Sequence, residues 1–256
     1  MPAPAGPLAG VIPPGFAGRA NLTIPLATLL HLANRPGEMT GIGPLDPDLA
    51  RDLAAAAART ARSTWCVTVT DQDGHAIGHG CARPAPAGRR ANPPKRDKPG
   101  TAGGPDPPGG PSFSFTATDQ PGPPGGYGTW TFSTGTPGQR DLLIALEPIP
   151  TGQCDHRHEA KGHDPGVLLR HLAQVRHATC TGLGCRRPST SADFEHNIPY
   201  EAGGRTCLCN GNPKCRYDHR LKQDPRWNAE QLPTGHVRWT TPSGRQYLTE
   251  PTRYPI

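Results

Sequence analysis

Residues 180–219 hold a dense group of cysteine, histidine and acidic side chains in an otherwise polar sequence. Cys180 and Cys185 are separated by four residues, and Asp-Phe-Glu-His-Asn-Ile-Pro follows at 193–199. Cys209-Asn210 and Cys215-x2-Asp218-His219 complete the group. Thiolate, imidazole and carboxylate are the ligands that Zn²⁺ prefers in proteins. The pattern therefore favours a small module built around metal, with free buried thiols as the alternative.

The remaining composition limits how much of the chain can fold. Of 256 residues, 33 are proline and 32 are glycine, and only 34% are hydrophobic. Such a chain buries too little apolar surface to offset the entropy of ordering all of it. We expect small folded islands, with a disordered N-terminus at 1–20 and a disordered Pro/Gly-rich linker at 83–138.

Residues 21–82 have the pattern of a small α+β unit. Asp46-Pro47 is a strong helix start, because Asp is a preferred N-cap and Pro fits the first helical position. This helix is predicted to run to about Arg62. Trp65 to Thr70 reads as a strand, and Asp73-Gly74 as a hairpin turn into the next strand.

Order is expected to return over residues 139–256. Asp164-Pro165 repeats the helix-start signal, and an apolar spacing of three to four continues to Arg176. Leu142 to Leu146 is too short to assign to strand or helix. The pattern then predicts a strand at 193–198, a short exposed helix at 214–223, and a final hairpin with strands at 227–232 and 237–241.

Charge and cysteine content suggest a compartment and a class of partner. The net charge of +6 and the pI near 9.0 make an anionic partner plausible, with nucleic acid first and an anionic membrane second. Prolines interrupt residues 1–26, which disfavours a signal peptide, and no apolar run is long enough to cross a bilayer. We expect a cytoplasmic protein whose eight cysteines are metal ligands or free thiols rather than disulfides.

The histidine of the 193–199 segment is the natural candidate for a general base. Imidazole titrates near neutral pH, and the preceding Glu195 offers a hard oxygen ligand for a cation such as Mg²⁺. On a strand Glu195 and His196 point to opposite faces, so both meet one site only if the strand ends there. Pro199 supports such an ending. Asn210 and His219 could complete the site.

These residues resemble a known motif. The run from Asp193 to Gly204, with Asn210 and His219 at their spacing, is similar to the motif of HNH endonucleases. The segments 43–53 and 239–244 resemble actinobacterial HNH proteins that carry an N-terminal domain of unknown function numbered 222 (DUF222). The chain resembles a shortened member, in which residues 21–82 are the end of that N-terminal domain.

The resemblance implies an α+β chain whose catalytic part is a ββα-metal finger with its core motif at 180–222. In it His196 activates water for the hydrolysis of DNA phosphodiester bonds. Glu195 and His219 hold one catalytic divalent cation, Mg²⁺ or Mn²⁺, and Asn210 braces the loop beside His196. The alternative from another class is a zinc-stabilised module that binds DNA without cutting it.

The resemblance also implies a structural Zn²⁺ clamp. Cys180 and Cys185 supply the first ligand pair and Cys215 begins the second. Asp218 stands where a Cys or His is expected, so the site becomes Cys3Asp unless another cysteine takes the fourth place. That place was left open among Asp218, Cys207 and Cys209.

Basic side chains surround these positions, and a phosphate-binding surface requires them. We expect the DNA-binding set to be Arg187, Arg216, Arg220 and Lys222, with Arg186, Arg205 and Lys214 nearby. Cys154-Asp-His156-Arg-His158, with His163 beyond, is a further possible metal cluster if the segment is a strand. Because this segment lacks a matching second ligand pair, the sequence favours a loop that binds nothing or binds metal only adventitiously.

Overall fold

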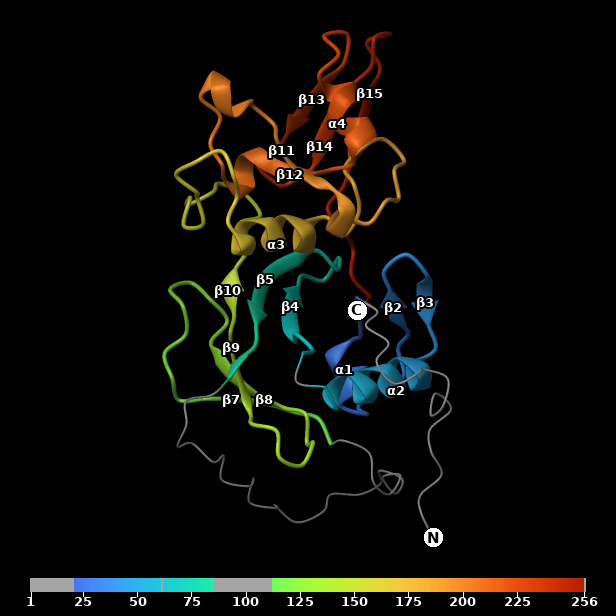
Figure 1. Ribbon diagram of the computed structural model, residues 1–256, viewed down its shortest axis with the longest axis vertical. Helices are drawn as coiled ribbons and strands as arrows, with labels where there is room; N and C mark the ends of the chain where they lie inside the picture. Colours follow the sequence, from blue (N-terminus) through green and yellow to red (C-terminus); the bar gives the residue numbers. More distant parts are fainter. Residues whose placement is uncertain (1–20, 61, 85–111, 256) are drawn as a thin grey trace. The chain divides into compact units, whose positions relative to one another are not determined.

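A computed structural model describes residues 21–60, 62–84 and 112–255 (Figure 1). The fold is mixed α and β, with several small antiparallel sheets and few helices. The described residues divide into two compact units. One consists mainly of residues up to 67 together with 80–146, and the other of 68–79 with 147–254. The expected disordered N-terminus at 1–20 lies outside the described residues.

The first unit begins with a three-stranded antiparallel sheet. Its strands are β1 (Leu22–Thr23), β2 (Gly37–Met39) and β3 (Gly43–Leu45), in the order β1-β2-β3. The short helix α1 (Leu26–Leu29) follows β1. This sheet supports the longer helix that comes next in the sequence.

Helix α2 (Pro47–Ala58) confirms the predicted helix start. Asp46 is its N-cap, and the carboxylate accepts hydrogen bonds from the backbone N–H groups of Asp48 and Leu49 at 2.9 and 3.4 Å. The helix ends at Ala58, earlier than the expected Arg62. Its buried face consists of alanines four residues apart, so the backbone of β2 can approach closely: a Cβ on Gly37 would lie 2.8 Å from that of Ala50.

A four-stranded antiparallel sheet completes the first unit. It has the order β6-β9-β8-β7, formed by β6 (Arg83–Pro84), β9 (Leu142–Ala145), β8 (Thr129–Ser133) and β7 (Ser114–Ala117). The latter part of the expected 83–138 linker is therefore folded. Residues 85–111 of that linker lie outside the described residues.

Aromatic side chains explain why this proline-rich segment folds. Phe115 stacks on Trp130 with ring centroids 4.7 Å apart. Trp65 lies 5.1 Å from Phe132 and 5.7 Å from Phe113. Phe113 and Phe115 are two residues apart, as are Trp130 and Phe132 in β8, which is the period of two that a strand requires, and such rings bury a large apolar area. The overall Pro/Gly content concealed that alternation.

Strands β4 (Cys66–Thr70) and β5 (Ala76–Cys81) confirm the predicted strand and turn. Gly74 in the turn has φ 84°, a conformation that glycine adopts without steric cost. β5 also pairs with β10 (Glu147–Pro148). Cys66 and Cys81 form a disulfide, so the expectation that all eight cysteines are ligands or free thiols is wrong.

Helix α3 (Val167–Arg176) opens the main part of the second unit. Its N-cap is Gly166, which offers no side-chain cap, rather than the expected Asp164. Its buried face presents Leu169, Leu172 and Val175 to a core that also contains Leu208. Leu172 and Val175 of the predicted apolar spacing are therefore buried, but Val167 and Leu168 are exposed.

A strand pair and a helix follow α3. β11 (Asp193–His196) pairs antiparallel with β12 (Gly211–Lys214), and α4 (Arg216–Lys222) comes directly after β12. One-turn 3-10 helices occur at Ser189–Ser191, Tyr200–Ala202 and Leu208–Asn210. In Figure 1, α3 lies beside β11 and β12. The predicted strand and helix are thus confirmed, with slightly shorter bounds.

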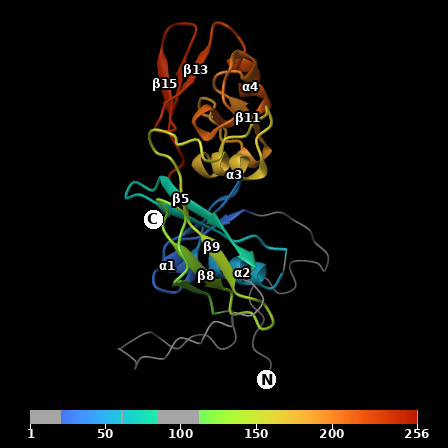
Figure 2. The ribbon, with the colours of Figure 1, turned by 90° about the vertical axis from the view of Figure 1, so that its left-hand side faces the viewer.

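The chain ends in a three-stranded sheet of β13 (Asn228–Gln231), β14 (Val237–Thr240) and β15 (Gln246–Thr249). The predicted hairpin is confirmed, and β15 is an additional strand. Trp239 is fully buried in a small core that Leu221 of α4 also contacts. Figure 2 shows these strands beside α4. Within the described residues, no helix has the length and apolar character that spanning a membrane requires.

The buried His177 makes stability sensitive to acid. Burial lowers the pKa of His177 to about 3, and its Nε2 is 3.0 Å from the Gly235 carbonyl oxygen. As the pH falls, the histidine of the unfolded chain becomes protonated near pH 6.5, whereas His177 of the folded chain becomes protonated only near pH 3. Stability contributed by the neutral ring is therefore complete above pH 6.5 and is lost as the pH falls toward 3, at up to ~1.4 kcal/mol per pH unit.

We predict that His177→Gln flattens this dependence. Chemical denaturation of wild type and variant between pH 7 and 4 gives the free energy of unfolding at each pH. If this free energy falls with pH equally in both proteins, His177 is not the cause of the acid sensitivity.

Candidate functional site

The first cluster comprises Cys180, Cys185, Cys215 and Asp218, whose candidate ligand atoms all lie within 4.8 Å of one another. The Sγ atoms of Cys185 and Cys215 are 4.0 Å apart. Asp218 Oδ2 lies 3.2 Å from the Sγ of Cys180 and 3.0 Å from that of Cys215. Cys180, Cys215 and Asp218 are buried. These four side chains could hold a metal ion such as zinc.

Local structure brings the four ligands together. Cys215 is the N-cap of α4, and Asp218 lies in the first turn, where the helix dipole favours a negative charge. The backbone N–H groups of Gly182 and Cys215 donate to Cys180 Sγ at 3.3 and 3.1 Å. Burial raises the pKa of the Cys180 thiol, and these two hydrogen bonds oppose the shift. These two hydrogen bonds favour the thiolate form of Cys180, which a bound metal ion would stabilise further.

The fourth position of the first cluster is occupied by Asp218. Cys207 and Cys209, the alternatives, belong to a different group of side chains with Cys154 and His156. Asp218 reaches the sulfur atoms because residue 182 is glycine: a Cβ there would lie 2.2 Å from Asp218 Cγ. Of the three candidates, Asp218 is therefore the one that lies with Cys180, Cys185 and Cys215.

His196 is the last residue of β11, so the strand ends at Glu195-His196, as one shared site for both side chains would require. Its ring is buried and contacts Phe194, two residues earlier on the same face, with centroids 5.5 Å apart. Its Nε2 is 2.8 Å from the hydroxyl of Thr206. Burial lowers the pKa of His196, and nearby His163 adds to this effect.

Glu195 points to the other side of the strand and meets helix α4. Its Oε2 lies 2.9 Å from His219 Nε2, and its Oε1 lies 2.7 Å from Lys222 Nζ. Lys222 also donates to the carbonyl of His196. On the same face, Asp193 Oδ2 is 3.2 Å from His219 Nδ1. The structure thus brings Glu195 and His219 together beside the strand end that carries His196.

Asn210 holds the two ends of the loop between β11 and β12. Its Oδ1 accepts from the backbone N–H of Ile198 at 2.7 Å. Its Nδ2 donates to the carbonyls of Ile198 and Arg205 at 3.0 and 2.8 Å. Gly204 permits this approach, because a Cβ there would lie 2.8 Å from Asn210 Nδ2. The side chain therefore fixes the backbone immediately after His196.

The expected basic residues do not all lie on the surface. Arg187, Arg216 and Arg220 are exposed, and Arg216 and Arg220 border a shallow hollow next to His219. Lys222 is mostly buried and contacts Glu195 instead of facing solvent. The basic surface is therefore formed by arginines.

Lys214, expected on the basic surface, is buried instead. Its Nζ donates to Thr181 Oγ1 at 2.9 Å and to Asn212 Oδ1 at 2.7 Å, and it lies 4.8 Å from the centre of the Trp239 ring. Burial lowers the pKa of Lys214 to about 7. Every residue of β12 is buried, so no position on this strand faces solvent.

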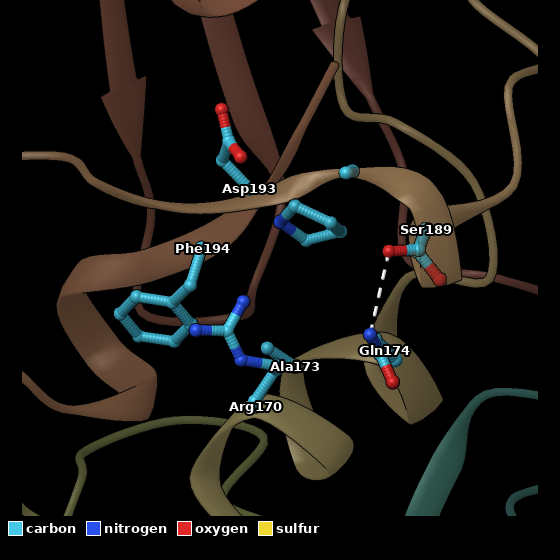
Figure 3. A pocket seen from close by; sticks show the side chains of 8 residues that line it. Arg170, Ala173, Gln174, Ser189, Asp193 and Phe194 are labelled. Atoms are coloured by element: carbon cyan, nitrogen blue, oxygen red, sulfur yellow. Dashed lines mark hydrogen bonds between the residues drawn. The ribbon is translucent and has the colours of Figure 1, made fainter. Parts of the chain in front are cut away.

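A narrow pocket separates α3 from β11 (Figure 3). Arg170 and Gln174 reach it from the helix, and Phe194 from the strand. Gln174 Nε2 donates to the Ser189 carbonyl at 3.4 Å. Because Phe194 and His196 share one face of β11, this packing helps to fix the strand that carries His196.

Sequence reasoning missed several neighbours of these residues. Asp193 contacts His219, and Thr206 contacts His196. Lys222 was expected to contact DNA but forms an ion pair with Glu195. The alternation of acidic residues at 193 and 195 was a usable signal, because residues two apart share a strand face.

Comparison with known proteins places part of the chain among uncharacterized relatives. The uncharacterized proteins Rv3776 and Rv2100 of Mycobacterium tuberculosis (strain ATCC 25618 / H37Rv) are each 36% identical over 88 residues, which is 34% of this chain. The match covers 17% and 16% of their lengths, so the chain spans about a sixth of the curated relatives it matches. No family model matches the chain, and no solved structure matches it.

We predict that Gly182→Ala weakens metal retention at the first cluster, because the new methyl group displaces the Asp218 carboxylate. Elemental analysis after dialysis against a chelator measures this, with Asp218→Ala as the direct comparison. Gly162→Ala is the matched control, since a Cβ there meets open space. Equal zinc retention by the two glycine variants would refute the role of Asp218.

Proposed function

We propose that this chain is a metal-dependent HNH endonuclease that hydrolyses phosphodiester bonds in DNA. The observation that carries the proposal is the 2.9 Å approach of Glu195 Oε2 to His219 Nε2 at the end of β11. The two side chains come from a strand and from a helix, and Glu195 immediately precedes the candidate base His196, whose ring lies on the other face of the strand. A solely structural zinc protein has no need for this convergence.

The order of elements supports the resemblance to a ββα-metal finger. β11 and β12 pair antiparallel, the loop between them is held by Asn210, and α4 follows directly. We propose that the first cluster holds structural Zn²⁺ as Cys3Asp, and that it fixes the start of α4 relative to the segment after α3. His219 is on that helix, so the clamp would position one cation ligand.

Glu195 and His219 would hold the catalytic cation. The Glu195 carboxylate is mostly buried, with one oxygen facing His219 Nε2 and the other facing the Lys222 ammonium, which a bound cation would have to tolerate or displace. A carboxylate oxygen and an imidazole nitrogen are suitable ligands for a divalent ion such as Mg²⁺ or Mn²⁺. When bound, such an ion supplies charge stabilisation for the phosphate oxygens.

We propose Nδ1 of His196 as the nitrogen that accepts the proton. Thr206 Oγ1 lies 3.3 Å from the carbonyl oxygen of His163, to which it can donate its one hydrogen. In the proposed arrangement, the 2.8 Å contact at His196 Nε2 then has the imidazole N–H as donor and the hydroxyl as acceptor. This tautomer leaves an unshared electron pair on Nδ1. In the proposed reaction, His196 Nδ1 removes a proton from the attacking water.

We predict that His196→Ala abolishes plasmid nicking while zinc content and the circular dichroism spectrum stay unchanged. Without an imidazole at the end of β11, no group there accepts the proton of water. Assays contain Mg²⁺, Mn²⁺ or EDTA, and the EDTA arm should be inactive. His236→Ala, a change outside the site, is the control. Cleavage retained by His196→Ala in a nuclease-free preparation would refute this role.

Thr206 is predicted to act as a positioning residue for His196. Thr206→Val removes the acceptor of the Nε2–H hydrogen bond, so the reactive tautomer is no longer fixed. We expect kcat to fall on the order of tenfold or more with little change in KM. Thr206→Ser keeps the hydroxyl and should restore most of the activity. An equal loss in both variants would indicate packing rather than tautomer control.

The second candidate is a zinc-stabilised module that binds DNA without cutting it. One observation favours it: Lys222 already contacts Glu195 and the His196 carbonyl, so an internal ammonium occupies part of the proposed cation environment. Exposed Arg216 and Arg220 would still contact phosphates. DNA binding with no nicking in any metal arm would select this alternative.

A further inference from the structure

A second group of potential metal ligands lies in the same unit as the first. The second cluster comprises Cys154, His156, Cys207 and Cys209, whose candidate ligand atoms lie within 4.8 Å of one another. Two short pairs form it, Cys-x-His from the segment after β10 and Cys-x-Cys from the loop before β12. The ligand pair that was missing from the sequence argument is therefore supplied by Cys207 and Cys209.

The distances in the second cluster match those around tetrahedral zinc. Cys154 Sγ is 3.6 Å from Cys207 Sγ, and His156 Nδ1 is 3.4 and 3.7 Å from the Sγ atoms of Cys207 and Cys209. Zn–S bonds of about 2.3 Å and Zn–N bonds of about 2.0 Å give tetrahedral edges of about 3.8 Å between sulfurs and about 3.5 Å from nitrogen to sulfur. A disulfide would bring two sulfurs to about 2.0 Å, so none is formed here.

A buried arginine contacts both segments that carry the cluster. Arg176 is 5% exposed, and its guanidinium donates to the carbonyls of Leu208 and Pro150 at 3.1 and 2.7 Å. Burial lowers the pKa of Arg176 to about 10, and negative charge on Cys154, Cys209 and Cys207 would oppose this shift. Three thiolates and a neutral imidazole around Zn²⁺ carry a net charge of minus one, which complements the guanidinium.

We propose that Cys154, His156, Cys207 and Cys209 bind a second structural Zn²⁺ as a Cys3His site. The ion cross-links the segment after β10 to the loop that ends at Asn210. Other contacts already align these segments: the Ala160 N–H donates to the Thr206 carbonyl at 2.9 Å. Because Cys209 immediately precedes Asn210, the cross-link fixes the backbone that holds this loop, whether or not the chain cuts DNA.

Zinc content measured by difference tests the proposal. Full-length wild type, Cys154→Ser, Cys209→Ser and Cys185→Ser are purified with zinc and analysed for metal per chain. We expect each second-cluster variant to lose one equivalent relative to wild type, and Cys154→Ser/Cys185→Ser to lose two. His158→Gln is the matched control, because His158 lies in the same segment but contacts Glu147. Unchanged zinc content in both Cys154→Ser and Cys209→Ser would overturn the proposal.

A second measurement uses unmodified protein, in case the serine variants do not fold. The zinc-loaded wild-type chain is alkylated with and without chelator, and the labelled cysteines are located by mass spectrometry. Cys154 and Cys209 are partly exposed, so they should react quickly when no ion protects them. We expect slow labelling of both until chelator is added. Rapid labelling in the zinc-loaded chain would contradict a metal site. Neither measurement depends on nuclease activity, so its outcome is separate from that of the proposed function.

Discussion

The antiparallel pairing of β11 with β12 is the constraint on which the candidate site depends. Its register places Glu195 opposite Asn212 and His196 opposite Gly211. Gly211 leaves room for the ring of Phe194, since a Cβ there would lie 1.9 Å from the ring. Because side chains alternate along a strand, His196 lies on the same face as Phe194, toward the loop between β11 and β12, and Glu195 lies on the other face, toward α4. A shift of one residue would exchange these two faces.

Polar cross-links hold this region, because apolar residues are few. The cores of the second unit are small, and the surrounding loops are joined by the side chain of Asn210, by Arg176 and by two clusters of potential metal ligands. Such contacts are directional, so they fix particular side-chain positions and not merely a compact state. The proposed zinc ions would therefore maintain the geometry at His196 without contacting the substrate.

Local signals in the sequence predicted much of the fold. The Asp46 cap, the Gly74 turn, the strand at 193–196 and the final hairpin are confirmed because each depends on neighbouring residues. The folded part of 112–138 was missed because its alternating aromatics are embedded among prolines and glycines.

Long-range contacts could not be predicted in the same way. The burial of Lys214 and the joining of Cys207 to Cys154 each depend on tertiary structure. For the candidate site, the sequence identified the residues at the end of β11 and on α4. It could not identify Lys222 as a neighbour of Glu195.

The most direct test of the account is Mn²⁺ binding to the zinc-loaded chain, followed by electron paramagnetic resonance. We predict one Mn²⁺ site that is lost or greatly weakened in Glu195→Gln and in His219→Ala, and retained in His196→Ala. Mn²⁺ binding that is unchanged by both Glu195→Gln and His219→Ala would contradict the claim that these side chains share a cation beside His196.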